Sequence, residues 1–212
     1  MKNYFKILTI SVFTFLMTFN VETAKAQDFG ADIVSSYVWR GLQYHQGAAV
    51  QPWLELETGG LSGGVWGSFP VTAGDEGHEL DLWVSYDFGP LAITATQYTF
   101  PDEFGFYGSE LLDGDFEVSG STSIGSFDLT AGYFTDSEAL YIEAGFPIGP
   151  VGIAVGYGDG WYTTDGDGGI VNVSMSGEKE IKITDDFSLP VFGSFIFNPE
   201  AEAAYIVFGV SL

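Results

Sequence analysis

Hydrophobic and polar residues alternate with a period of two along most of this chain. Three short runs between positions 31 and 69 show the pattern first, and glycine-rich stretches separate them. In the run 50–57 the even positions are apolar, whereas the odd positions include Gln51, Glu55 and Glu57. Because successive side chains of a strand point to opposite sides, each run predicts a β-strand with one apolar and one polar face.

The same alternation continues to the last residue and predicts twelve strands. The expected strands cover residues 31–40, 50–57, 61–69, 79–88, 91–100, 116–124, 127–133, 140–146, 151–157, 171–180, 189–197 and 205–212. The segments 91–100 and 189–197 are apolar on both faces. The pattern therefore does not say which face of these two strands points inward.

The connections alternate between tight turns and longer loops. The tight turns contain Gly59-Gly60, Gly89-Pro90, Gly125-Ser126, Gly149-Pro150 and Asp185-Asp186. The other connections cover residues 41–48, 70–78, 101–115, 135–138, 158–169 and 198–202. Short turns at one rim and longer loops at the other are typical of outer-membrane barrels, whose short turns face the periplasm.

These patterns predict an all-β fold, a single transmembrane antiparallel up-and-down β-barrel of about twelve strands. In such a barrel the apolar face points outward and is covered by lipid instead of by a protein core. Closure of the sheet leaves no unpaired strand edge. The alternative is a soluble secreted β-sandwich, in which the same alternation faces an inner core. Aromatic residues near strand ends favour the barrel because they fit interfacial girdles; these are Tyr37, Trp39, Phe69, Phe88, Tyr133, Phe146 and Tyr157.

The two ends of the chain fit export to the outer membrane. Lys2 and Lys6 precede an apolar stretch at 7–19, and the triplet 24–26 is Ala-Lys-Ala. This layout predicts a signal peptide over residues 1–26 and a barrel over 27–212, with an uncleaved anchor as the alternative. The stripe Ile206, Phe208, Val210 and Leu212 resembles the last strand of barrel-assembly substrates. We therefore expect outer-membrane lipid and the barrel-assembly machinery as partners.

Composition excludes several classes of function. The chain has 29 acidic and 6 basic residues, a formal net charge of −23, so nucleic acid is not an expected partner. It has no cysteine and therefore no disulfide framework. The two histidines, His45 and His78, lie in expected loops without a nucleophile motif, so we expect neither an enzyme nor a cofactor. Asp165 and Asp167 resemble the start of a calcium loop that lacks its later acidic ligand, and a plain acidic loop is the preferred interpretation.

Three motifs carry a resemblance to a known family. They are VSSYVWRGL at 34–42, GAAVQP at 47–52 and GGVWGS at 63–68. They resemble the start of the TorF-type porins, also called the Gcw_chp family of exported Gram-negative proteins. The motifs cover about the first quarter of the mature chain, and the remainder is similar in strand pattern and length. The resemblance implies a small outer-membrane barrel that forms a channel.

The polar faces define the candidate site. If the phasing holds, the following residues point into the lumen: Arg40, Glu55, Glu57, Glu79, Asp81, Asp128 and Glu143. Arg40 is the one cation between residues 27 and 178, and we expect it to pair with Glu79 and Asp81, which lie near the same rim. This pair either stiffens the barrel or helps to select solutes.

The sequence therefore predicts a narrow, passive, cation-preferring pore for small solutes in the cell outer membrane. The alternatives are a non-conducting barrel whose acidic loops bind ions or partners, and the soluble sandwich. The expected orientation places cysteines introduced at Gly74 and Gly105 outside the cell and one introduced at Gly125 in the periplasm.

Overall fold

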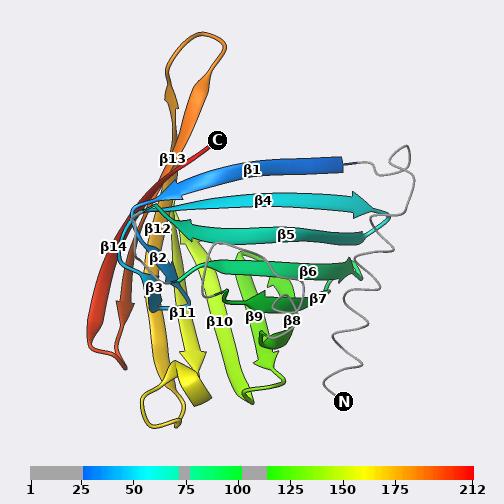
Figure 1. The fold of residues 1–212 in the computed structure, drawn as a ribbon, viewed down its shortest axis with the longest axis vertical. Helices are drawn as coiled ribbons and strands as arrows, with labels where there is room; N and C mark the ends of the chain where they lie inside the picture. The colour runs from blue at the N-terminus through cyan, green and yellow to red at the C-terminus, as the bar shows by residue number, and fades with distance from the viewer. Residues whose placement is uncertain (1–25, 72–76, 102–113) are drawn as a thin grey trace.

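The computed structural model describes residues 26–71, 77–101 and 114–212, and it shows a closed antiparallel β-barrel of twelve strands (Figure 1). The barrel strands are β1 (Ala26–Val34), β4 (Ala49–Thr58), β5 (Leu61–Pro70), β6 (Glu79–Asp87), β7 (Ala92–Thr99), β8 (Phe116–Ile124), β9 (Phe127–Phe134), β10 (Ala139–Ile148), β11 (Val151–Gly158), β12 (Gly169–Lys182), β13 (Ser188–Asn198) and β14 (Ala203–Ser211). Among the described residues, no helix is long and apolar enough to cross a membrane.

The expected all-β barrel of about twelve strands is confirmed, and the alternative of a two-sheet sandwich is wrong. Strands that follow one another in the barrel pair as antiparallel neighbours, and β1 closes the sheet against β14. The closure is short: only Asp32 to Val34 pair in register with β14, whereas β1 pairs with β4 along its whole length. In Figure 1, β1 and β4–β6 cross the view, while β12–β14 run nearly at right angles to them. The expected signal peptide, apart from Ala26, lies outside the described residues.

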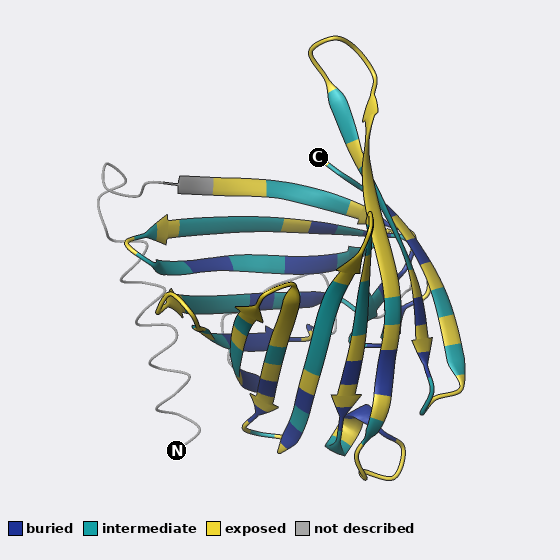
Figure 2. Cartoon of the chain, turned by 180° about the vertical axis from the view of Figure 1, so that it is seen from behind, coloured by how far each residue is buried: buried dark blue, intermediate teal, exposed yellow. Residues whose placement is uncertain are grey.

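Exposed and buried side chains alternate along the strands, as the banding in Figure 2 shows. On β14, Ile206 and Phe208 are exposed on the outer face, whereas Val207 between them is buried. Of the two strands that the sequence left without a phase, β13 follows the same rule, whereas the last four residues of β7, Thr96 to Thr99, are all buried. On β13, Phe195 points outward and Ile196 inward; on β7, Ile93 is exposed. The outer face is therefore an apolar surface, and within residues 26–71, 77–101 and 114–212 no second layer of protein covers it.

The two rims differ as expected. We call the end with the connections β4–β5, β6–β7, β8–β9, β10–β11 and β12–β13 the turn rim, and the opposite end the loop rim. At the turn rim, Gly59 and Gly60 join β4 to β5 with φ angles of 58° and 83°, which a two-residue hairpin turn requires at both positions. The loop rim includes the short 3-10 helix η2 (Gly160–Tyr162).

The prediction of one continuous strand over residues 31–40 is wrong for its second half. β1 ends at Val34, and the next residues form a separate two-stranded sheet of β2 (Tyr37–Trp39) and β3 (Leu42–His45). The chain reverses at Arg40 and Gly41, whose φ angles are 50° and 82°. Period-two alternation continues through this reversal because the strands of a hairpin alternate as well. The pattern of residue types therefore does not mark the end of β1.

Because of this reversal, part of the predicted aromatic girdle is wrong. Phe88, Tyr133 and Tyr157 are exposed, as a girdle at the membrane interface requires. Tyr37 is buried, and Trp39 packs among the buried rings of the barrel interior. These two residues do not belong to a girdle.

Candidate functional site

A hairpin fills the loop-rim end of the barrel lumen. It consists of residues 37–45, and we call it the lumenal hairpin. The Trp39 ring lies 5.4 Å from Tyr98 on β7 and 6.3 Å from Phe134 on β9, measured between ring centroids. On the other side, the Gly41 carbonyl accepts a hydrogen bond of 3.1 Å from Asn198 Nδ2 on β13. The lumenal hairpin therefore reaches opposite walls of the barrel.

The tip of the hairpin fits closely against the wall. A Cβ atom on Gly41 would lie 1.8 Å from the backbone oxygen of Val171 on β12, so only glycine fits there. At the base, the Ser36 hydroxyl donates to the His45 carbonyl at 2.7 Å and accepts from the Gln43 amide at 2.9 Å. These contacts hold the lumenal hairpin at both ends.

Arg40, at the tip of the lumenal hairpin, makes the charged contact between the hairpin and the barrel wall. Its guanidinium donates to both carboxylate oxygens of Glu117 on β8, at 3.0 Å for Nη2 to Oε1, and to the Tyr162 hydroxyl at 2.7 Å. The same group lies 4.1 Å from the centroid of Trp39 and 4.5 Å from that of Tyr141. A bidentate ion pair combined with cation–π contacts gives arginine a role that lysine cannot fill.

Arg40 stays charged although it is largely buried. Burial by itself lowers the pKa of the guanidinium, but the hydrogen bonds and the charge of Glu117 raise that pKa above its ordinary value. The side chains of Arg40 and Glu117 are 12% and 2% exposed. A buried ion pair of this kind is costly to break, because removing one partner leaves the other charge unpaired.

The expected partners of Arg40 are wrong. Glu79 and Asp81 do point inward from β6, and both are buried, but the ion pair of Arg40 is with Glu117. Glu79 instead lies close enough to interact with Tyr37, at the start of the lumenal hairpin. The reason is the reversal at Arg40, which directs the guanidinium across the lumen to β8 instead of along the wall to β6.

The remaining predicted lumen residues lie apart from one another. On β10, Glu143 accepts hydrogen bonds from the Tyr141 hydroxyl and, at 2.8 Å, from the amide of Asn172. Glu55 and Glu57 lie on β4, on the same side as buried Gln51. Asp128 lies on β9 near the turn rim, where it accepts from the Ser123 hydroxyl at 2.6 Å. The predicted carboxylates therefore line the wall but do not form one cluster.

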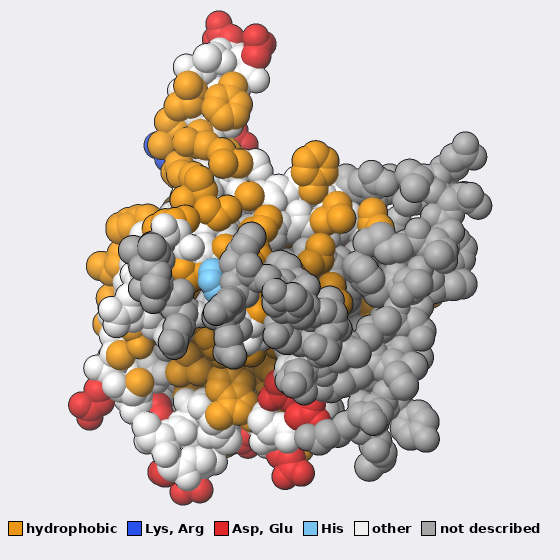
Figure 3. Space-filling view, in the orientation of Figure 1, with side chains coloured by type: hydrophobic (Ala, Val, Ile, Leu, Met, Phe, Trp, Pro, Cys, Tyr) orange, Lys and Arg blue, Asp and Glu red, His pale blue; other side chains and the backbone are white. Residues whose placement is uncertain are grey.

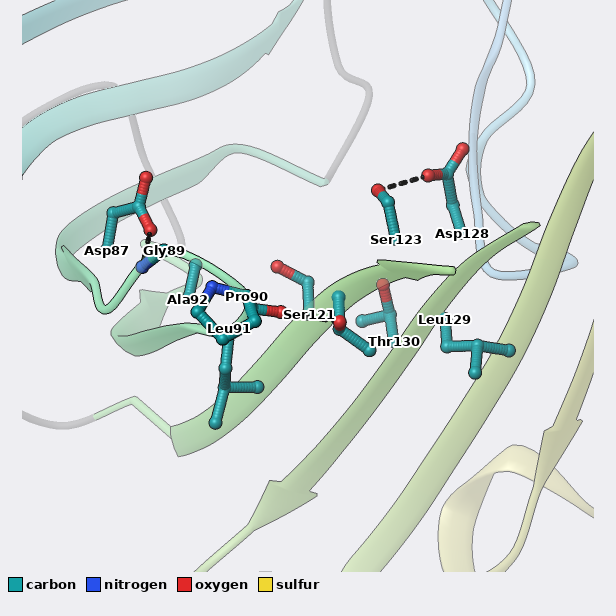
Figure 4. A pocket seen from close by; sticks show the side chains of 11 residues that line it. Asp87, Gly89, Pro90, Leu91, Ala92, Ser121, Ser123, Asp128, Leu129 and Thr130 are labelled. Atoms are coloured by element: carbon teal, nitrogen blue, oxygen red, sulfur yellow. Dashed lines mark hydrogen bonds between the residues drawn. The ribbon is translucent and has the colours of Figure 1, made fainter. Parts of the chain in front are cut away.

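The turn-rim half contains polar cavities. One of about 430 Å³ lies at the ends of β6–β9, and Figure 4 shows Ser123 directed at Asp128 beside Ser121 and Thr130. A second, of about 310 Å³, lies at the ends of β10–β13 and includes Glu178. Small and polar side chains predominate here, in contrast to the packed rings at the loop rim.

The residues that the sequence offered for catalysis or calcium binding do not form a catalytic or metal site in the described part of the chain. His45 is buried at the end of β3, and Asp165 accepts a hydrogen bond from the Asp167 backbone within its own loop. Over residues 26–71, 77–101 and 114–212, no group of three or more His, Cys, Asp or Glu side chains is placed to hold a metal ion.

Comparison of the chain with protein-family models and with curated protein sequences finds no match. The resemblance to the TorF-type porins therefore stays a prediction.

Proposed function

We propose that this protein is an outer-membrane β-barrel that forms a narrow, passive, cation-preferring pore, with the lumenal hairpin as its constriction. Outer-membrane lipid covers the exposed apolar face, and the barrel-assembly machinery recognises the C-terminal strand during insertion. The transported species are small solutes and inorganic cations. The proposal includes no catalytic step.

The observation that carries this proposal is the charge balance of the lumen wall. Carboxylates face inward from several strands, including Glu55, Asp128 and Glu143, whereas the guanidinium of Arg40 is neutralised by Glu117. A low-dielectric wall focuses the field of such charges, and charges that line a pore select ions by sign. The lumen therefore attracts cations.

The packing of the lumenal hairpin favours a second candidate, a barrel that does not conduct. Trp39 lies among buried rings, and Gly41 contacts the opposite wall without space for a methyl group. In this second candidate the acidic loops bind ions or partners at the cell surface. Both candidates share the same fold and differ in whether ions pass the hairpin.

Planar-bilayer recording separates them. The purified barrel is compared with a variant in which a short Gly-Ser linker replaces residues 37–45. The pore proposal expects a small conductance from the natural chain and a larger one from the variant, both cation-preferring. Silence of the natural chain with conduction by the variant supports the second candidate, and anion preference in either rejects the pore. Heat-modifiable migration on a detergent gel verifies that each preparation is folded.

A further inference from the structure

An aromatic pocket of about 290 Å³ opens at the loop rim beside the lumenal hairpin. It is lined by the aromatic residues Trp39, Tyr44, Tyr98, Phe100, Phe134 and Trp161, together with Asp115. Figure 3 shows hydrophobic side chains gathered beside acidic ones at this edge of the molecule. The pocket shares Trp39 and Tyr44 with the lumenal hairpin, but the proposed pore needs no ligand bound in it.

The rings enclose the pocket at several angles and do not form a single stack. Phe134 meets Trp39 and Trp161 edge-on, at angles of 87° and 72°, and Tyr98 is tilted by 50° from Trp39. The face of an aromatic ring attracts a cation through its quadrupole. Trp39 already does so within the protein, since the Arg40 guanidinium lies over its ring.

Asp115 adds a fixed negative charge. Its Oδ1 accepts from the Phe116 backbone at 3.0 Å, and its Oδ2 accepts from the Ser137 hydroxyl at 2.6 Å. Ser137 in turn accepts from the indole N–H of Trp161 at 3.1 Å. One serine thus positions both the carboxylate and a ring of the pocket before any ligand binds, which lowers the entropic cost of binding.

The charge of Asp115 has no cationic partner within the part of the chain that the structure describes. The ion pairs there join Arg40 to Glu117 and Lys182 to Asp185. A ligand that enters the pocket therefore meets apolar ring faces and one uncompensated carboxylate. That combination excludes anions, and it offers few hydrogen bonds to a sugar.

We propose that this pocket binds a small organic monocation of the quaternary ammonium class. Such a cation presents apolar methyl groups to the rings and a positive charge to Asp115, and it needs no hydrogen-bond donor. This inference goes beyond the proposed pore and does not depend on conduction, because it concerns equilibrium binding at the loop rim.

Isothermal titration calorimetry on the full barrel tests the proposal. The micelles are of a maltoside, because detergents with a choline head group would compete. The probes are choline, its neutral isostere 3,3-dimethyl-1-butanol, and phosphocholine, which carries the same head group with an added phosphate. Choline should bind, and both the isostere and phosphocholine should bind about tenfold or more weakly, since tenfold corresponds to the loss of about one charged contact. Equal binding of the isostere would show an apolar pocket and overturn the proposal.

Two substitutions locate the binding. Asp115→Asn and Trp161→Leu should each weaken choline binding roughly tenfold. The matched controls Asp186→Asn and Phe187→Leu, at the exposed turn between β12 and β13, should leave it unchanged. If Trp161→Leu does not fold, the isosteric Asp115→Asn decides. Unchanged affinity in Asp115→Asn, or no choline binding by the natural chain, would reject the site.

Discussion

The Arg40 guanidinium donates hydrogen bonds to both carboxylate oxygens of Glu117, although the two residues lie 77 positions apart in the sequence. One belongs to the turn of a hairpin inside the lumen and the other to the barrel wall at β8. The pair therefore fixes an element that is not part of the barrel sheet to the barrel itself. It links the stability of the barrel to the position of the lumenal hairpin.

Removing one member of this pair should destabilise the protein. Glu117→Gln or Arg40→Met leaves the other charge buried and unpaired, so we expect a loss of roughly 3–5 kcal/mol in the free energy of unfolding. The measurement is urea unfolding of the refolded barrel, followed by tryptophan fluorescence. Arg40→Met combined with Glu117→Leu should recover most of the loss, because replacing a buried pair by apolar residues is often neutral.

The exposed pair Lys182–Asp185 is the matched control. Its partners are 65% and 95% exposed, and Lys182→Met should change the free energy of unfolding by less than about 1 kcal/mol. An effect at Glu117 that is no larger than the effect at Lys182 would show that the lumenal hairpin is not held by its ion pair.

Gly41→Ala should loosen the lumenal hairpin. The new methyl group collides with the Val171 carbonyl, and the positive φ adds about 1–2 kcal/mol of backbone strain. Gly59→Ala is the control, because Gly59 also has a positive φ but nothing lies within 4 Å of its added Cβ. Faster protease cleavage within 37–45 is expected for Gly41→Ala alone. Equal cleavage of both variants would contradict the close fit at the hairpin tip.

The outer face should tolerate no charge at mid-height. Phe195 on β13 is exposed and apolar, so Phe195→Arg should cost roughly 2–4 kcal/mol in lipid vesicles. Its neighbour Ser194 lies on the inward face, and Ser194→Arg should cost less. Unfolding in vesicles compares the two variants. A reversed order would mean that the faces are assigned wrongly or that lipid does not cover the outer one.

Cysteine labelling tests the orientation. Gly74 and Gly105, which the sequence places outside the cell, lie outside the described residues, so Asp165 in an exposed loop-rim segment takes their place. Asp165→Cys should react with an impermeant maleimide on intact cells, whereas Gly125→Cys or Ser126→Cys at the turn rim should not. Labelling at 125 or 126 with silence at 165 would invert the topology.

The sequence was sufficient for the barrel because every strand of a barrel has to alternate its side chains between the outer face and the lumen. That rule also placed Glu79, Asp81 and Glu143 on the inward face. It was not sufficient for the lumenal hairpin, whose strands alternate with the same period as β1. Arg40-Gly41 is also not one of the residue pairs that mark a two-residue turn, since asparagine or aspartate before glycine is usual there.

The contacts within the lumen were beyond sequence analysis for a different reason. Glu117 has a clear inward phase in its strand, yet nothing local indicates that Arg40 meets β8 instead of β6. The aromatic pocket likewise collects Trp39, Phe134 and Trp161 from separate segments. Such contacts depend on how deeply the hairpin folds into the barrel, and only the three-dimensional structure gives that depth.

The most direct test of the pore is the reversal potential of the purified barrel across a potassium chloride gradient, recorded at low and at high salt. The acidic wall predicts a cation preference that is strong near 0.1 M, where the screening length is about 10 Å, and weak near 1 M, where it is about 3 Å. Anion preference at low salt, or the absence of any conductance from a preparation that migrates as a folded barrel, would contradict the account.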